Sequence, residues 1–155
     1  MTYEIVDFAC TFDVVPRRAA IVALEQQILE CVQADMPLEH IFADGLYARQ
    51  LTIPKNCVLT GAIHKREHIN IVLKGEITVA TDEGVRRIRA PAVIVSKPGT
   101  KRAGFAHEET IWLTVHACEA KDATEAEALL VTNDYADYER FLEAQKCLSQ
   151  SPAQS

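Results

Sequence analysis

Residues 68–96 read HINIVLKGEITVATDEGVRRIRAPAVIVS, which is four short runs rich in β-branched residues with turn residues between them. The turn signals are Lys74-Gly75, Asp82-Glu83-Gly84 and Ala90-Pro91. Short strands at such close spacing are typical of an antiparallel sandwich or a small barrel. The same pattern extends to both sides and predicts strands over 45–53, 57–63, 68–73, 76–81, 85–89, 92–96, 101–106 and 110–117.

Helical patterns flank the strands. Residues 17–34 follow Pro16 and repeat apolar residues at steps of three and four, which predicts a helix ended by Met36-Pro37. Asp134 is suited to cap a second helix that runs through Lys146. The predicted fold is mainly β, a single small antiparallel β-barrel or jelly roll with an N-terminal and a C-terminal helix. We expect an N-terminal strand and helix over 1–44, the barrel over 45–118, a helical extension over 119–148 and a disordered tail over 149–155.

Composition excludes several classes of protein. The chain has 155 residues, of which 48% are hydrophobic and 25% charged, close to the average for one globular domain. No apolar run approaches the roughly 20 residues of a membrane helix, and no signal peptide is visible at the N-terminus. The five cysteines are scattered and contain no C-x-x-C, which favours reduced thiols in a cytoplasmic protein.

Charge is divided unevenly along the chain. Residues 1–44 carry 2 basic and 8 acidic side chains, 45–118 carry 11 and 6, and 119–155 carry 3 and 8. Acidic helices that balance a basic sheet would explain this division, and so would a positive pocket for an anionic ligand. The net charge of −6 and the lack of a basic patch interleaved with aromatics disfavour nucleic-acid binding.

Two segments of the chain resemble the two motifs of the cupin superfamily. The first segment, Gly61-Ala-Ile-His64-Lys-Arg-Glu-His68 continued to Gly75, resembles G-x5-H-x-H-x3-4-E-x6-G. The second, Pro98-Gly99-Thr-Lys-Arg102, resembles G-x5-P-x-G-x2-H-x3-N. The resemblance covers about residues 45–118. It places His64 on the second histidine, His68 on the glutamate, Ala62 on the first histidine and Arg102 on the third histidine. The segments Gly45–Arg49 and Pro98–Arg102 also resemble small phage-encoded cupins of unassigned function.

Neutral imidazole is a common ligand of transition metals, so His64 and His68 are candidate metal ligands. On a straight strand they would lie about 13 Å apart, and only the bend that the cupin resemblance implies brings them together. A hairpin closed at His107-Glu108-Glu109 would make His116 a third candidate ligand. Residues 101–106 would then pair with 110–115, which sets Arg102 opposite Thr114 and places His116 one pleat away on the same face.

The same hairpin would set Trp112 opposite Gly104, where the absence of a side chain leaves room for the indole. The predicted site then has His64, His68 and His116 as metal ligands and Arg102, Trp112 and Arg49 as ligand-binding residues. The alternative is that His116 is a hydrogen-bonded barrel residue and Arg102 an outward charge. His40 and His107 are predicted to lie in loops, exposed to solvent.

Two functions follow from this interpretation. The first is a cupin-type protein that binds a small ligand, anionic if Arg102 faces it, with no catalytic residue identified. The second is a metal-dependent cupin enzyme of the isomerase or dioxygenase type, with zinc, iron or nickel at the three histidines. We expect a homodimer in which the helix at 17–34 and a strand at Tyr3–Phe8 cover a partner's sheet, with neither nucleic acid nor membrane as partner.

Overall fold

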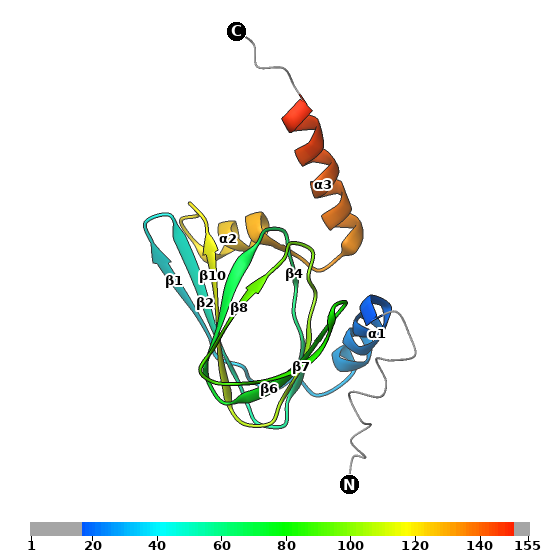
Figure 1. The fold of residues 1–155 in the computed structure, drawn as a ribbon, viewed down its shortest axis with the longest axis vertical. Coiled ribbons are helices and arrows are strands. Elements are labelled where there is room, and N and C mark those ends of the chain that lie inside the picture. Colours follow the sequence, from blue (N-terminus) through cyan, green and yellow to red (C-terminus); the bar gives the residue numbers. More distant parts are fainter. Residues whose placement is uncertain (1–16, 151–155) are drawn as a thin grey trace.

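The computed structural model describes residues 17–150, and the strand predicted at Tyr3–Phe8 lies outside them (Figure 1). Ten strands and one helix come first: α1 (Arg17–Leu29), β1 (Leu38–Ala43), β2 (Leu46–Ile53), β3 (Val58–Thr60), β4 (Ile63–His64), β5 (His68–Lys74), β6 (Glu76–Thr81), β7 (Gly84–Arg89), β8 (Ala92–Ser96), β9 (Ala103–Ala106) and β10 (Thr110–Ala117). They are followed by α2 (Ala123–Leu130), β11 (Val131–Thr132) and α3 (Tyr135–Gln150).

The strands form two facing antiparallel sheets. Sheet A has the order β1-β2-β10-β5-β8 and sheet B the order β3-β9-β6-β7, while β11 pairs only with β4. Successive strands cross between the sheets at β2–β3, β5–β6, β7–β8, β8–β9 and β9–β10, so β2-β10-β5-β8 faces β3-β9-β6-β7. This strand order is that of a jelly roll. The predicted antiparallel jelly roll with an N-terminal and a C-terminal helix is therefore confirmed.

The hairpin predicted at His107-Glu108-Glu109 is wrong. Strand β9 pairs with β3 and β6 in sheet B, whereas β10 pairs with β2 and β5 in sheet A. Both His107 N–H and Glu108 N–H donate to the carbonyl of Glu76, at 2.8 and 3.3 Å. This holds the segment against β6 and carries the chain to the other sheet. Thr114 therefore lies opposite Arg49 and Asn70, and Trp112 opposite Leu51 and Val72.

Strand β1 was not predicted, although the sequence contains its turn. Asp44-Gly45 joins β1 to β2, and Gly45 has a φ of +70°, a conformation that glycine adopts without strain. As a result His40 lies in a strand, where its Nδ1 is 2.8 Å from the hydroxyl of Tyr47. Helix α1 ends at Leu29, five residues earlier than predicted.

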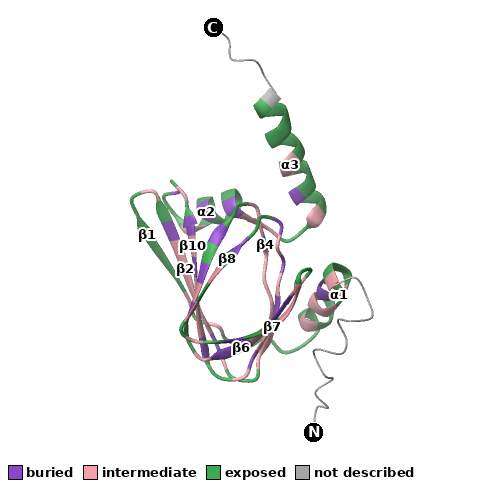
Figure 2. Cartoon of the chain, in the orientation of Figure 1, coloured by how far each residue is buried: buried purple, intermediate pink, exposed green. Residues whose placement is uncertain are grey.

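The core fills the space between the two sheets, and Figure 2 shows buried positions gathered there while most of α3 is exposed. Its buried members are Ile53, Val72, Ile77, Val79, Ile88 and Ala106. Helix α1 covers the outer side of sheet B, where Ile21 packs on Ala80 and Ala103. No described helix covers the outer side of sheet A.

An ion pair anchors α1 to the sheets. The ammonium of Lys101 is 2.8 Å from a carboxylate oxygen of Glu25, and the side chain of Lys101 is 0% exposed. The same oxygen accepts a hydrogen bond from the Thr60 hydroxyl at 3.0 Å. A buried ammonium that loses its counter-ion keeps its desolvation cost, so this pair holds the helix in place.

We therefore expect Glu25→Gln to lower the free energy of unfolding by about 3 kcal/mol, because it strands the buried charge of Lys101. Glu30→Gln is the matched control, since Glu30 is exposed and follows the same helix. Urea denaturation at neutral pH measures both. Equal stability of the two variants would contradict the anchoring role.

Candidate metal and ligand site

Three histidines meet at one end of the jelly roll. His64 ends β4, His68 begins β5 and His116 lies in β10. Their ring centroids are 4.1 Å (His64–His68), 5.0 Å (His64–His116) and 4.7 Å (His68–His116) apart. Residues 65–67 make the bend between β4 and β5, so the first two rings stack where a straight strand would hold them far apart. One ring nitrogen from each histidine lies within 4.8 Å of the others.

The hydrogen bonds of these rings leave nitrogen atoms unused. Nδ1 of His68 is 3.0 Å from the carbonyl oxygen of Arg66, so this nitrogen carries the proton and donates. Its Nε2 is then a lone-pair acceptor, buried and without a hydrogen-bond partner in the described chain. Nδ1 of His64 is 3.0 Å from Nε2 of His116, and the other nitrogen of His116 is likewise buried without a partner.

The environment keeps the imidazoles neutral. Burial, reinforced by the neighbouring His68, His116, Arg102 and Arg49, lowers the pKa of His64 to about 2. Burial and His68 lower the pKa of His116 to about 4. Burial also lowers the pKa of His68, partly offset by its bond to the Arg66 carbonyl. At neutral pH all three rings offer lone pairs, which is the form that binds metal ions.

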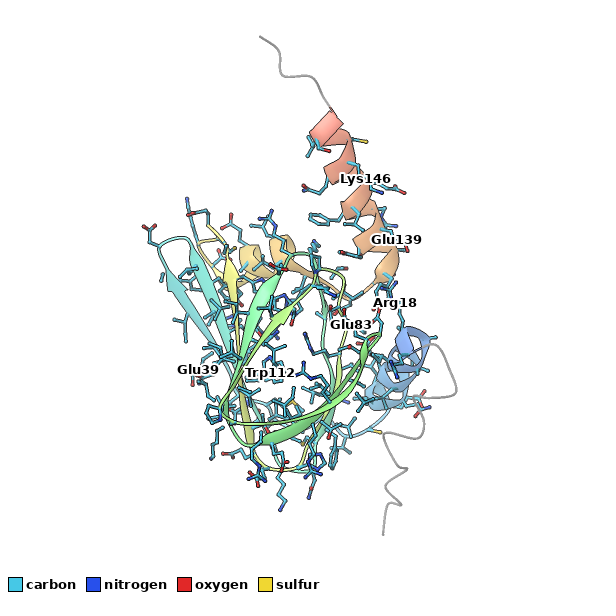
Figure 3. All side chains as sticks on the ribbon, in the orientation of Figure 1. Arg18, Glu39, Glu83, Trp112, Glu139 and Lys146 are labelled. Atoms are coloured by element: carbon cyan, nitrogen blue, oxygen red, sulfur yellow. The ribbon has the colours of Figure 1, made fainter. Side chains whose placement is uncertain are left out.

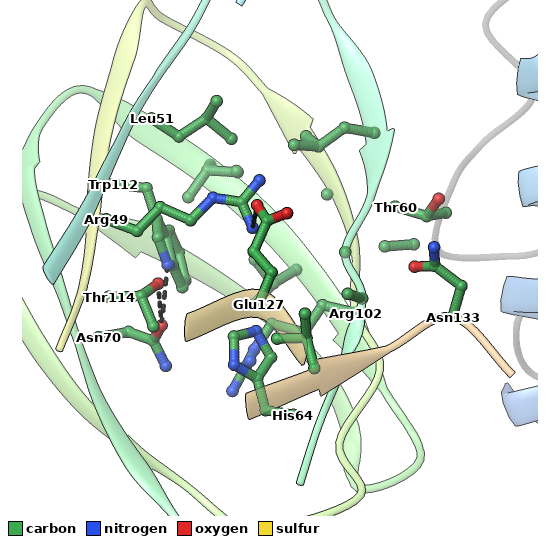
Figure 4. Close-up of a pocket in the computed structure, with 18 residues that line it drawn as sticks. Arg49, Leu51, Thr60, His64, Asn70, Arg102, Trp112, Thr114, Glu127 and Asn133 are labelled. Atoms are coloured by element: carbon green, nitrogen blue, oxygen red, sulfur yellow. Dashed lines mark hydrogen bonds and ion pairs between the residues drawn. The ribbon is translucent and has the colours of Figure 1, made fainter. Parts of the chain in front are cut away.

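A cavity of about 380 Å³ opens beside this cluster (Figure 4). It lies between the sheets and is closed at one end by α2 and β11, which contribute Glu127 and Val131. His64 lines it, whereas His68 and His116 lie behind His64. The indole of Trp112 also faces the interior (Figure 3). The remaining polar lining comes from Arg49, Thr60, Asn70, Arg102, Thr114 and Asn133.

Arg102 is the cation of this cavity that has no carboxylate partner within the described chain. Its guanidinium donates to the hydroxyl of Ser96 and lies 6.0 Å from the ring centre of Trp112. Burial lowers its pKa, and Glu83 opposes that effect. By contrast, Arg49 is 3.9 Å from the carboxylate of Glu127. The cavity therefore presents two guanidiniums and one carboxylate.

The buried amide of Asn70 organises the wall between Arg102 and Trp112. Its oxygen accepts from the indole N–H of Trp112 at 3.0 Å and from the Thr114 hydroxyl at 2.9 Å. Its nitrogen donates to the Ser96 hydroxyl at 2.6 Å, and Ser96 in turn accepts from Arg102. Every hydrogen bond of this network lies on the inner face of sheet A or at its edge.

The structure brings all six predicted site residues to this end of the jelly roll. Arg49, Arg102, Trp112 and His64 line the cavity, and His68 and His116 complete the histidine cluster. His107 lies in a bend, as predicted, but it is half-buried rather than exposed, and its Nε2 is 2.7 Å from the hydroxyl of Thr78. The sequence analysis missed Asn70 and Glu127. Asn70 was detectable because it shares the inner face of β5 with His68 and Val72, whereas no pattern pointed to Glu127.

No protein-family model matches the chain, and no curated protein matches it in sequence. Solved structures resemble it in fold. An RmlC-like cupin from Shewanella frigidimarina is 16% identical over 61% of this chain and 85% of its own, with a TM-score of 0.49. KdgF from Halomonas sp. is 16% identical over 55% and 82%, with a TM-score of 0.47. A cupin superfamily protein from Desulfitobacterium hafniense is 9% identical over 60% and 86%, with a TM-score of 0.48. The fold assignment rests on the strand order described above.

Cys31, Cys57 and Cys118 are free thiols. A search of the described helices found none with both the length and the apolar character of a membrane span.

Proposed function

We propose that the protein binds a small anion in the cavity beside Arg102. The observation that carries the proposal is the half-buried guanidinium of Arg102, whose hydrogen-bond partner in the described chain is the neutral hydroxyl of Ser96. An unpaired charge away from water is costly, and a carboxylate or phosphate in the cavity would offset that cost. The five N–H donors of arginine suit bidentate binding of such groups.

The size and lining of the cavity support a small molecule. A volume of about 380 Å³ lies within the range of ligand pockets in proteins. Trp112, Leu51 and Val79 supply apolar walls, and the polar groups converge from one side. The pairing of Arg49 with Glu127 leaves one unit of positive charge for the ligand.

Arg102→Ala tests this proposal. Small carboxylates and inorganic phosphate at millimolar concentration are expected to raise the melting temperature of the wild type and to change the fluorescence of Trp112, the single tryptophan. The variant should lose both responses, and Arg102→Lys should keep part of them. Lys55→Ala, which removes an exposed charge elsewhere, is the control. An undiminished response of Arg102→Ala would rule out this site.

A metal-dependent enzyme is the second candidate, favoured by the three neutral imidazoles and by the free Nε2 of His68. The donor set fits a transition metal, because ligand nitrogens around tetrahedral zinc lie about 3.4 Å apart and these lie within 4.8 Å. The Arg66 carbonyl fixes the tautomer of His68, as outer-shell partners of metal ligands commonly do. A bound metal would supply Lewis acidity to a molecule in the cavity. Arg102 would orient that molecule and Glu127 could hold a proton.

We expect protein purified without a histidine tag to take up one equivalent of Zn²⁺, Fe²⁺ or Ni²⁺ per chain, measured by elemental analysis after gel filtration. His64→Ala, His68→Ala and His116→Ala should each lower that content at least tenfold, since two imidazoles bind far more weakly than three. His40→Ala and His107→Ala are the matched controls and should bind as the wild type does. A wild type that retains no metal after incubation with each ion would contradict the metal site.

We propose further that two copies associate through the outer side of sheet A. The register aligns one uninterrupted apolar row across all five strands, made of Ile41, Ala48, Val115, Ile69 and Val95. The next row adds Leu113, Ile71 and Val93. Val93 and Val95 are 69% and 62% exposed, which is unusual for aliphatic residues in a sheet. An exposed apolar surface of this extent typically marks an interface.

A second copy fits this surface better than a charged partner would. Five strands at about 4.8 Å and two rows at about 6.8 Å span about 330 Å² in projection, enough for the apolar centre of an interface of standard size. The chain carries a net charge of −6, yet the rows contain a single charged residue, Glu39. Two copies can therefore meet here without strong repulsion.

Light scattering at micromolar concentration should give the mass of a dimer. Ile69→Lys combined with Val95→Lys would place charges in the centre of the apolar row and should give a particle of about 17 kDa with unchanged circular dichroism. Lys substitutions at the exposed α3 residues Ala144 and Leu148 serve as the control. A wild-type monomer would contradict the proposal, and a dimer unaffected by the sheet variant would move the interface elsewhere.

A further inference from the structure

A second cavity, of about 200 Å³, lies on the other side of Arg102. It opens between β7 and β8, which are the edge strands of sheets B and A on the same side of the jelly roll. We call it the lateral cavity. Arg102 and Val79 line both this cavity and the one beside His64. The guanidinium of Arg102 thus lies between the two cavities.

The lateral cavity is rich in positive charge. Arg86, Lys97 and Arg102 line it, against a single acid, Glu83. Glu83 is held by Lys97 at 2.7 Å, an ion pair that joins the turn between β6 and β7 to the loop after β8. Glu83 lies at this side of the molecule in Figure 3. Arg86 and Arg102 are then left without a carboxylate partner in the described chain.

The direction of Arg86 follows from strand alternation. Ile88, two residues later in β7, is buried in the core between the sheets. Arg86 shares that inner face, whereas Val85 packs on the α1 side and Arg87 reaches Glu76. Around Arg86 and Arg102, the cavity also offers the hydroxyls of Ser96, Thr81 and Thr100. Cations and hydroxyls together are the groups that bind carboxylates and phosphates.

We propose that the lateral cavity is a second anion subsite, and that the ligand is an elongated dianion with one acidic group beside Arg102 in the main cavity and the other at Arg86. The proposal rests on the function proposed above, since Arg102 is shared. The five N–H donors of its guanidinium allow it to serve acceptors on both sides. An uncharged middle section of the ligand would lie along Val79 and beside Arg102.

Calorimetric titration with butyrate and with the dicarboxylates succinate, glutarate and adipate tests this. We expect at least one dicarboxylate to bind the wild type about tenfold more tightly than butyrate, the gain expected of one additional charge-assisted contact. Arg86→Ala should abolish that advantage and leave butyrate binding unchanged. Arg87→Ala is the matched control, because it removes the same charge from the opposite face of the same strand. Arg86→Lys should restore part of the advantage.

The outcomes separate the two proposals. If Arg102→Ala abolishes butyrate binding while Arg86→Ala leaves the dicarboxylate advantage intact, the main cavity stands and the lateral subsite falls. If Arg86→Ala weakens dicarboxylate binding and Arg102→Ala does not weaken butyrate binding, the lateral cavity binds an anion alone and the main-cavity proposal falls. A wild type that binds no dicarboxylate more tightly than butyrate overturns the elongated dianion.

Discussion

The geometry of the candidate site depends on the hydrogen bonds of the buried Asn70 amide. The amide sits on β5, accepts from two side chains of β10 and donates to Ser96 at the end of β8, so it links three adjacent strands of sheet A. A buried amide left without these partners would carry its full desolvation cost, which makes the arrangement cooperative. Through Ser96 the network also reaches Arg102, a residue in the loop between sheets. The direction of Trp112 and the position of the guanidinium are therefore set by one side chain.

Strand alternation explains why the site was predictable although the pairing was not. Trp112, Thr114 and His116 share the inner face of β10 whichever strand lies beside them, because side chains alternate with a period of two. The predicted hairpin with 101–106 was wrong, yet it assigned these residues to the correct face. The partner of a strand depends on how the chain crosses between sheets, and that crossing is decided by the backbone contacts at Glu76. Backbone contacts of this kind cannot be predicted from the hydrophobic pattern of the sequence.

The positions of Glu127 and of the paired His64 and His68 could not be predicted from the sequence pattern, because they depend on tertiary contacts. Glu127 reaches Arg49 because α2 packs over the end of sheet A through Ala126, Leu130 and Tyr47. That packing is a long-range contact between a helix and a strand about eighty residues earlier. The proximity of His64 and His68 depends on the bend at residues 65–67, which the resemblance to cupins supplied and the spacing alone did not. The amide of Asn70 was different, since a polar residue between inward His68 and Val72 can be recognised on any strand.

Charge couples the two halves of the candidate site. Burial lowers the pKa of His64 most, and the guanidiniums of Arg102 and Arg49 add to this effect because they disfavour another positive charge. A dication at the histidines would meet the same field. An anion beside Arg102 cancels part of that field. Thermodynamic linkage is reciprocal: if a bound anion raises the affinity for a metal by some factor, a bound metal raises the affinity for the anion by the same factor. Glu127 supplies part of the compensation before any ligand arrives, since it pairs with Arg49 and lines a small space shared with His64 and His116. The charge of Arg102 would therefore be compatible with the proposed metal binding when an anionic ligand is present, and each of the two proposed binding events would then depend on the other.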